Sequence, residues 1–75
     1  MPIGFVLINT LPKQEHQVYN KLTKLPEIIE LYPLYGEYDF IIKLEVDNYK
    51  DLGNVIINNI KTINGVVDTK VLTGL

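Results

Sequence analysis

The strongest constraint on the fold of this chain is a weak internal repeat. When the sequence is shifted by 38 positions, "KLPEIIELYPLYG" at residues 24–36 aligns without a gap with "TINGVVDTKVLTG" at residues 62–74. The same shift places residues 3–9 on residues 41–47. Two copies are too few for a solenoid, but they suit a fold built from two similar β-α-β halves.

The hydrophobic pattern of the second half predicts a strand followed by a helix. Apolar residues alternate with charged ones at four positions, Phe40, Ile42, Leu44 and Val46, which is the period of a strand with one apolar face. Helical spacing then relates Tyr49, Leu52, Ile56, Ile60 and Ile63. Asn48 and Asp51 resemble a capping box at the helix start. Asn64-Gly65 ends the helix before a β-branched strand over residues 66–71.

The first half repeats this order of elements. A strand is predicted over residues 3–9, followed by a helix with Pro12 near its first turn and Pro26 at its end. The buried positions of this helix are predicted to be Val18, Leu22 and Leu25. A second strand over residues 27–35 leads into the hairpin "YGEYDF" at residues 35–40. The chain is therefore predicted to form one α+β domain over residues 1–75, a ferredoxin-like βαββαβ sandwich with both helices on one face of an antiparallel sheet.

The first strand has apolar residues on both faces. Ile3, Phe5 and Leu7 face one way, whereas Val6 and Ile8 face the other. Helices cover only one face, and residues expected to extend the uncovered patch are Ile29, Leu31, Ile41, Val67 and Val71. Because a chain of 75 residues without cysteine is marginally stable alone, we expect a homodimer that joins its sheets by face or by edge. The alternative is an open sheet with scattered apolar residues.

The charge balance and the apolar runs exclude two classes of partner. The chain has seven lysines, no arginine and a formal net charge of −2, which disfavours direct nucleic-acid binding. Its longest apolar run, "GFVLI" at residues 4–8, is far shorter than the roughly 20 residues that span a bilayer. The sequence also lacks the pattern of a signal peptide. We expect a soluble, cytoplasmic protein without a membrane partner.

Few residues in the chain are suited to catalysis or cofactor binding. His16 stands alone in "KQEHQ", and the chain contains neither cysteine nor serine. The glycines form no phosphate-binding motif. We therefore expect a solvated histidine, no metal, no cofactor and no enzymatic activity. A small dimeric α+β enzyme remains an alternative, because this fold supports several kinds of catalysis.

The hairpin carries the residues best suited to a small ligand. Glu37 and Asp39 are either solvated acids at its tip or part of a site in which Asp39 accepts the ammonium of a zwitterion. In the second case the amides near Gly36 approach the ligand's carboxylate, and Tyr35 or Tyr38 forms an apolar wall. The threonines of the last strand, at positions 69 and 73, share a face with the residue at 71 and pack locally more often than they bind ligands.

Four segments, "GFVLINT", "LYGEYDFIIKLEV", "INGVVDT" and "TKVLTG", together resemble the C-terminal effector domain of the Lrp/AsnC (feast/famine) transcription regulators, also called the RAM domain. The resemblance covers nearly the whole chain. It implies a ferredoxin-like fold that dimerises through its sheet, with rings of dimers and amino acids bound between dimers. The site residues that it implies are Gly36, Tyr38, Asp39 and Thr69.

The chain departs from the family pattern in three places. Val71 stands where a second threonine is frequent, "TLPKQEH" lacks a Pro-Gly pair, and no helix-turn-helix domain precedes the first strand. The resemblance therefore implies a stand-alone module that binds an amino-acid effector, oligomerises and modulates transcription indirectly, in assembly with a full-length regulator. The remaining alternative is a purely structural assembly module without a ligand.

Overall fold

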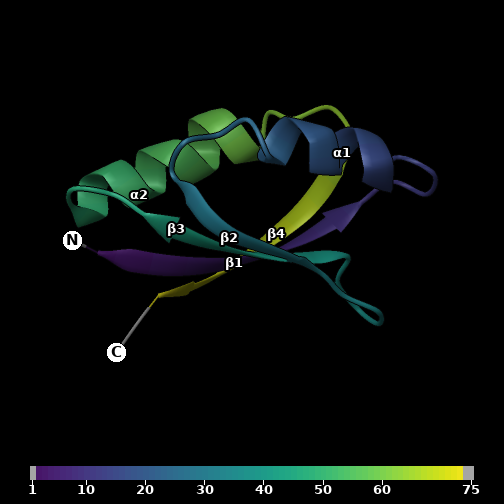
Figure 1. Ribbon diagram of the computed structural model, residues 1–75, viewed down its shortest axis with the longest axis horizontal. Coiled ribbons are helices and arrows are strands. Elements are labelled where there is room, and N and C mark those ends of the chain that lie inside the picture. Colours follow the sequence, from purple (N-terminus) through teal and green to yellow (C-terminus); the bar gives the residue numbers. More distant parts are fainter. Residues whose placement is uncertain (1, 74–75) are drawn as a thin grey trace.

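Two helices lie on one face of a four-stranded antiparallel sheet in the computed structural model, which describes residues 2–73 (Figure 1). The elements in chain order are β1 (Ile3–Thr10), α1 (Glu15–Leu22), β2 (Ile28–Pro33), β3 (Phe40–Glu45), α2 (Tyr49–Val55), the π-helical turn η1 (Ile56–Ile60) and β4 (Val66–Thr73). The sheet order is β2-β3-β1-β4, and each neighbouring pair is antiparallel. The predicted βαββαβ sandwich is confirmed. No helix within residues 2–73 is long and apolar enough to cross a membrane.

The hydrophobic core fills the space between the helices and one face of the sheet. Its members alternate along β1 and β3 and recur at helical spacing in α1, α2 and η1. The core residues are Val6, Ile8, Val18, Leu22, Phe40, Ile42, Leu44, Val46, Leu52, Val55, Ile56 and Ile60. The alternation predicted for β3 is thus confirmed at all four positions.

Two glycines lie where a helix packs closely against another part of the chain, Gly4 against α2 and Gly65 against α1. A Cβ atom at Gly4 would lie 2.8 Å from a methyl carbon of Leu52, so α2 packs onto β1 where no side chain intervenes. Gly65 has a φ of +107°, and a Cβ atom there would lie 2.9 Å from Val18. Its carbonyl accepts a hydrogen bond of 2.8 Å from the Leu11 amide. The helical segment ends at Ile60, four residues before the predicted break at Asn64-Gly65, and Gly65 instead lies in the turn before β4, where it packs against α1.

The start of α1 and the burial of Tyr49 in α2 differ from the predictions. Pro12 does not lie in the first turn of α1, because a turn with Lys13 at a φ of +69° separates it from Glu15. The helix then ends at Leu22, three residues before Leu25, which still packs against the core. Tyr49 was predicted to join the buried stripe of α2 but is 67% exposed. It is the first helical residue, where the chain is only beginning to turn towards the sheet.

Asn48 caps the N-terminus of α2, as its sequence predicted. Its extended backbone lets the side-chain Oδ1 accept a hydrogen bond of 2.9 Å from the Asp51 amide, one of the amides that lack a partner within the helix. We expect Asn48→Ala to lower the free energy of unfolding by about 1 kcal/mol, measured by urea denaturation. The control is Asn59→Ala at an exposed position of η1, which we expect to change stability by less than about 0.5 kcal/mol. Equal losses in the two variants would contradict a capping role for Asn48.

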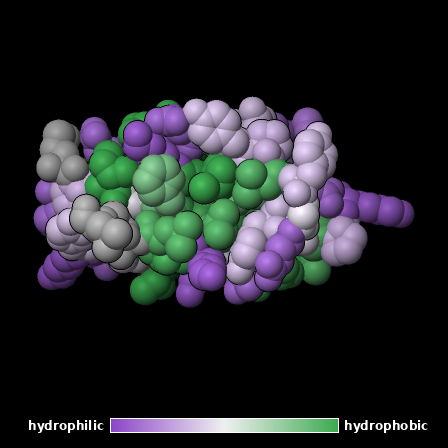
Figure 2. Space-filling model, turned by 90° about the horizontal axis from the view of Figure 1, so that it is seen from below, coloured by the Kyte–Doolittle hydropathy of each residue, from purple (hydrophilic) through white to green (hydrophobic). Residues whose placement is uncertain are grey.

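The face of the sheet opposite the helices carries an exposed apolar patch, which Figure 2 shows at the centre of that face. By strand register, this patch, here called the uncovered face, contains Ile3, Phe5, Leu7, Tyr32, Ile41 and Leu72. Two residues assigned to it from sequence lie on the helix side instead, because Leu31 pairs with Ile42 and Val71 pairs with Val6. The error at Leu31 follows from the register shift between Ile28 and Glu30 in β2, which alternation alone does not reveal, whereas Val71 lies in the regular part of β4. Ile29 and Val67, which lie beside the register shifts of their strands, are exposed.

A small polar network crosses the uncovered face. Lys43 forms an ion pair with Glu30 at 3.1 Å, and its Nζ lies 5.9 Å from the centre of the Phe5 ring. The Tyr32 hydroxyl donates a hydrogen bond of 2.6 Å to Glu30. The Tyr32 hydrogen bond and the Lys43 ammonium lower the pKa of Glu30, and the hydrogen bond to Glu30 raises the pKa of Tyr32. The two charges on this part of the face are therefore matched within one chain.

Candidate ligand-binding site

The connection between β2 and β3 is a tight turn that requires a glycine. Gly36 has a φ of +140°, which other residues rarely adopt, although a Cβ atom there would meet nothing within 4 Å. The requirement is therefore one of backbone conformation and not of crowding. Beyond the turn, the Leu34 amide donates a hydrogen bond of 2.8 Å to the Asp39 carbonyl. Glu37, at the tip, is exposed.

Asp39 is half-buried and fixed against the end of β1. Its Oδ2 accepts hydrogen bonds from the Thr10 amide at 2.8 Å and from the Thr10 hydroxyl at 3.0 Å. Its own amide donates to the Ile8 carbonyl at 2.9 Å. The description as a solvated acid thus suits Glu37 but not Asp39. Sequence analysis did not find Thr10, which lies 29 residues away from Asp39 and contacts it only after the sheet has formed.

The Asp39 carboxylate lines a groove of about 640 Å³ between α1 and the hairpin. Tyr19 and Phe40 form one part of its wall, with ring centres 6.0 Å apart, and the fully exposed Tyr35 extends it. The exposed His16 also lines the groove. Tyr38 is half-buried and does not line it, so Tyr35 is the tyrosine of the hairpin that forms an apolar wall.

Thr69 lies in a different hollow from Asp39. It pairs with Ile8 in the sheet, so β1 separates it from the end of β3. Together with Lys61 and Asp68, it lines a hollow of about 250 Å³ that shares no residue with the Asp39 groove. Its Oγ1 is buried and has no hydrogen-bond partner, which contradicts the expectation of a locally bonded threonine. The side chain of Thr73, the other threonine of this strand, lies outside the described residues.

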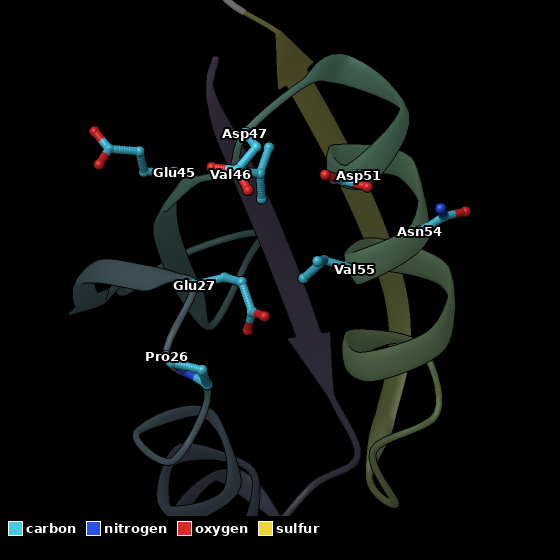
Figure 3. A pocket seen from close by; sticks show the side chains of 8 residues that line it. All are labelled: Pro26, Glu27, Glu45, Val46, Asp47, Asp51, Asn54 and Val55. Carbon is cyan, nitrogen blue, oxygen red and sulfur yellow. The ribbon is translucent and has the colours of Figure 1, made fainter. Parts of the chain in front are cut away.

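A third hollow, of about 390 Å³, lies between α2 and the ends of β2 and β3 (Figure 3). Four acidic residues line it, Glu27, Glu45, Asp47 and Asp51, and Figure 3 shows the Glu45 carboxylate directed away from the hollow. Figure 3 shows the Glu27 side chain directed towards this hollow, and its Oε1 is buried without a hydrogen-bond partner. Among residues 2–73, no group of three or more His, Cys, Asp or Glu side chains is arranged to hold a metal ion. This acidic hollow had no counterpart in the sequence analysis, because its residues come from three separate segments.

Residues 3–73 match the model of the family described as the Lrp/AsnC ligand binding domain. The chain therefore belongs to the Lrp/AsnC family. The predicted resemblance is confirmed.

Relatives and solved structures agree with this assignment. The HTH-type transcriptional regulator FL11 of Pyrococcus furiosus is 34% identical over 67 residues, which cover 89% of this chain and 44% of that protein. The crystal structure of FFRP-DM1 superposes with a TM-score of 0.95 at 36% identity and covers 100% of both chains. The structure of E. coli AsnC gives a TM-score of 0.92 at 31% identity over 99% of this chain and 50% of that one. The chain spans about half the length of the curated relatives that it matches.

Proposed function

We propose that this chain binds an amino acid and couples that binding to its own assembly, through which it modulates transcription together with a full-length Lrp/AsnC-type regulator. The observation that carries the proposal is the Asp39 carboxylate, which Thr10 holds in one orientation at an aromatic groove. A carboxylate fixed in this way accepts an ammonium group without further loss of side-chain entropy.

The proposed ligand lies with its ammonium group at Asp39 and its side chain against Tyr35. The turn at Gly36 leaves open space beside the backbone, which lets the ligand's carboxylate approach the amides of the hairpin. Tyr38, the other tyrosine of the hairpin, is half-buried and does not line the groove. Each of these contacts comes from one short connection, so a single rigid hairpin determines the geometry.

Thr69 enters the proposed site from a second copy of the chain. Within one copy, Thr69 and Asp39 line separate hollows on opposite sides of β1, so the two do not contact the same small ligand. A ligand bound between two copies would contact Asp39 of one and the unsatisfied hydroxyl of Thr69 of the other. The family's frequent second threonine is Val71 here, which lies on the same side of β4 as Thr69 but has no hydroxyl, so one polar contact to the ligand is lost.

The proposed dimer forms through the uncovered face. This face presents contiguous apolar side chains, and its Lys43–Glu30 ion pair is internally matched, so a second copy buries that pair without isolating either of its charges. Dimers then join into larger assemblies, including rings, when a ligand bridges them. A ligand held between copies stabilises the assembly that contains its pocket, which links ligand concentration to oligomeric state.

Native mass spectrometry tests ligand binding directly. The purified chain is measured alone and then with an equimolar mixture of the twenty amino acids, and we expect one amino acid to be retained at about one molecule per chain. Asp39→Asn keeps an acceptor for Thr10 but removes the charge, so we expect ligand affinity to fall by about tenfold to a hundredfold. Glu37→Gln is the matched control in the same hairpin, and we expect unchanged affinity.

Three results would contradict this proposal. Capture of none of the twenty amino acids would exclude an amino-acid sensor and favour a structural assembly module. Equal affinity in Asp39→Asn and the wild type would remove Asp39 from the site. A salt-sensitive gel shift by the purified chain would show that it binds DNA without a partner regulator.

A further inference from the structure

The groove beside Asp39 is lined by aromatic rings from both of the elements that form it. Tyr19 lies on α1, and Tyr35 lies on the connection between β2 and β3. Tyr35 is fully exposed and Tyr19 is 40% exposed, so both rings present apolar surface to water in the single chain. Five of the eight residues that line the groove are aromatic or apolar, namely Tyr19, Pro33, Leu34, Tyr35 and Phe40.

The charged residues of the groove suit a ligand with an uncharged side chain. Two acidic residues line it, Asp39 and Glu15, and together they disfavour a ligand whose side chain is acidic. Glu15 is exposed, and its Oε1 already accepts a hydrogen bond of 3.2 Å from the Lys13 amide. An ion pair between Glu15 and a basic side chain would therefore be screened by water and would contribute little. The neighbouring His16 offers a basic side chain no negative charge.

The size of the groove favours a large side chain. Its volume of about 640 Å³ lies within the range of about 300–1,000 Å³ that is typical of small-molecule sites. The methyl group of alanine would leave the rings of Tyr19 and Tyr35 in water. An aromatic side chain buries about 150–250 Å² of its own surface, and contacts between rings contribute beyond the area that they bury. An aromatic ligand therefore gains the most from these walls.

We propose that the ligand of this groove is an aromatic amino acid, whose ring lies between Tyr19 and Tyr35 while its ammonium group pairs with Asp39. This inference rests on the amino-acid site proposed above and adds the class of the ligand's side chain. Phe40 is 5% exposed, and its ring centre lies 6.0 Å from that of Tyr19. The ligand's ring thus extends an aromatic pair that is already present in the chain.

The chain contains no tryptophan, which makes L-tryptophan a direct probe of the groove. When it is excited where tyrosine does not absorb, all emission comes from the ligand, and we expect this emission to shift to shorter wavelength as the indole leaves water. Other amino acids are then measured as competitors of tryptophan. We expect leucine to compete about twofold to tenfold less well than phenylalanine, because it lacks the contacts between rings. We expect alanine, lysine and glutamate to compete at least about tenfold less well.

Substitutions at Tyr35 test the contact between rings. We expect Tyr35→Ala to weaken tryptophan binding by about tenfold, whereas Tyr35→Phe keeps the wild-type affinity because the ring and not the hydroxyl makes the contact. The side chain is fully exposed, so we expect both variants to keep the wild-type melting temperature. The matched control is Tyr49→Ala, which removes an exposed tyrosine of α2 outside the groove and is expected to leave the affinity unchanged.

The outcomes separate failure of this inference from failure of the proposed amino-acid site. Capture of a non-aromatic amino acid in native mass spectrometry, or competition by leucine or lysine equal to that of phenylalanine, would overturn the aromatic preference and leave the site itself supported. Equal tryptophan affinity in Tyr35→Ala and the wild type would overturn the ring contact. Indolepropionate has the ring and the carboxylate but no ammonium group, and we expect it to bind at least about tenfold more weakly than tryptophan. Equal binding of the two would instead contradict the ammonium contact at Asp39.

Discussion

Replacement of Ile42 with alanine is expected to lower the free energy of unfolding by about 2–5 kcal/mol. Ile42 is fully buried in β3. Its partners on the two neighbouring strands are Val6 on β1 and Leu31 on β2. Because β3 is an inner strand covered by the helices, the surrounding residues have little freedom to fill the cavity. A loss of this size is a large part of the 5–15 kcal/mol that is typical of a folded domain.

Ile57→Ala is the matched control for this prediction, since it removes the same atoms from a side chain that is 59% exposed on η1. We expect it to change stability by less than about 0.5 kcal/mol. Urea denaturation of both variants, at one protein concentration, measures the difference. Similar losses at the two positions would mean that the core does not lie between the helices and the sheet as described.

Hydrophobic periodicity was sufficient to predict the fold because both halves bury one face of each element. The alternation in β3 and the helical spacing around Val18 and Leu22 depend only on local sequence, and the structure confirms them. The errors occurred where the folded structure overrides a preference that is read from the local sequence. Pro12 suits a first helical turn, but Lys13 adopts a positive φ and delays α1 until Glu15.

The candidate site was less predictable than the fold, because its geometry depends on residues far apart in sequence. The hairpin with Gly36 was visible locally, and its turn is confirmed. The role of Thr10 in holding Asp39 was not visible, since nothing near either residue indicates that the end of β1 lies beside the hairpin. Thr69 and Asp39 were expected in one site, and only the sheet order shows that β1 separates them.

The uncovered face combines apolar side chains with a charge pair that needs no partner chain. An isolated lysine in such a face would oppose burial, because a buried unpaired charge is costly. Lys43 instead contacts Glu30 and lies near the Phe5 ring, so both of its interactions come from its own chain. The part of the face around Lys43 can therefore be covered by an apolar surface of a second copy without the need for a matching charge there.

Leu7→Glu is expected to abolish the proposed dimer through the uncovered face. Leu7 lies in β1 between Ile41 on β3 and Lys70 on β4, so a glutamate there is accommodated in one chain beside a lysine. In the dimer it would introduce two symmetry-related charges into the apolar interface, at a cost of about 3 kcal/mol or more, which weakens association by roughly a hundredfold. Sedimentation equilibrium and melting at several protein concentrations measure this effect.

The concentration dependence of melting distinguishes loss of the dimer from loss of the fold. For the wild type we expect the melting temperature to rise with protein concentration, since dissociation accompanies unfolding. Leu7→Glu is expected to melt lower and at a temperature that does not depend on concentration, whereas Ile57→Glu, on the exposed side of η1, keeps the wild-type behaviour. A wild-type melting temperature that is independent of concentration would mean that the single chain is stable with the uncovered face in water. That result would remove the physical reason for a dimer, because the uncovered face and its Lys43–Glu30 pair would then be stable in contact with water.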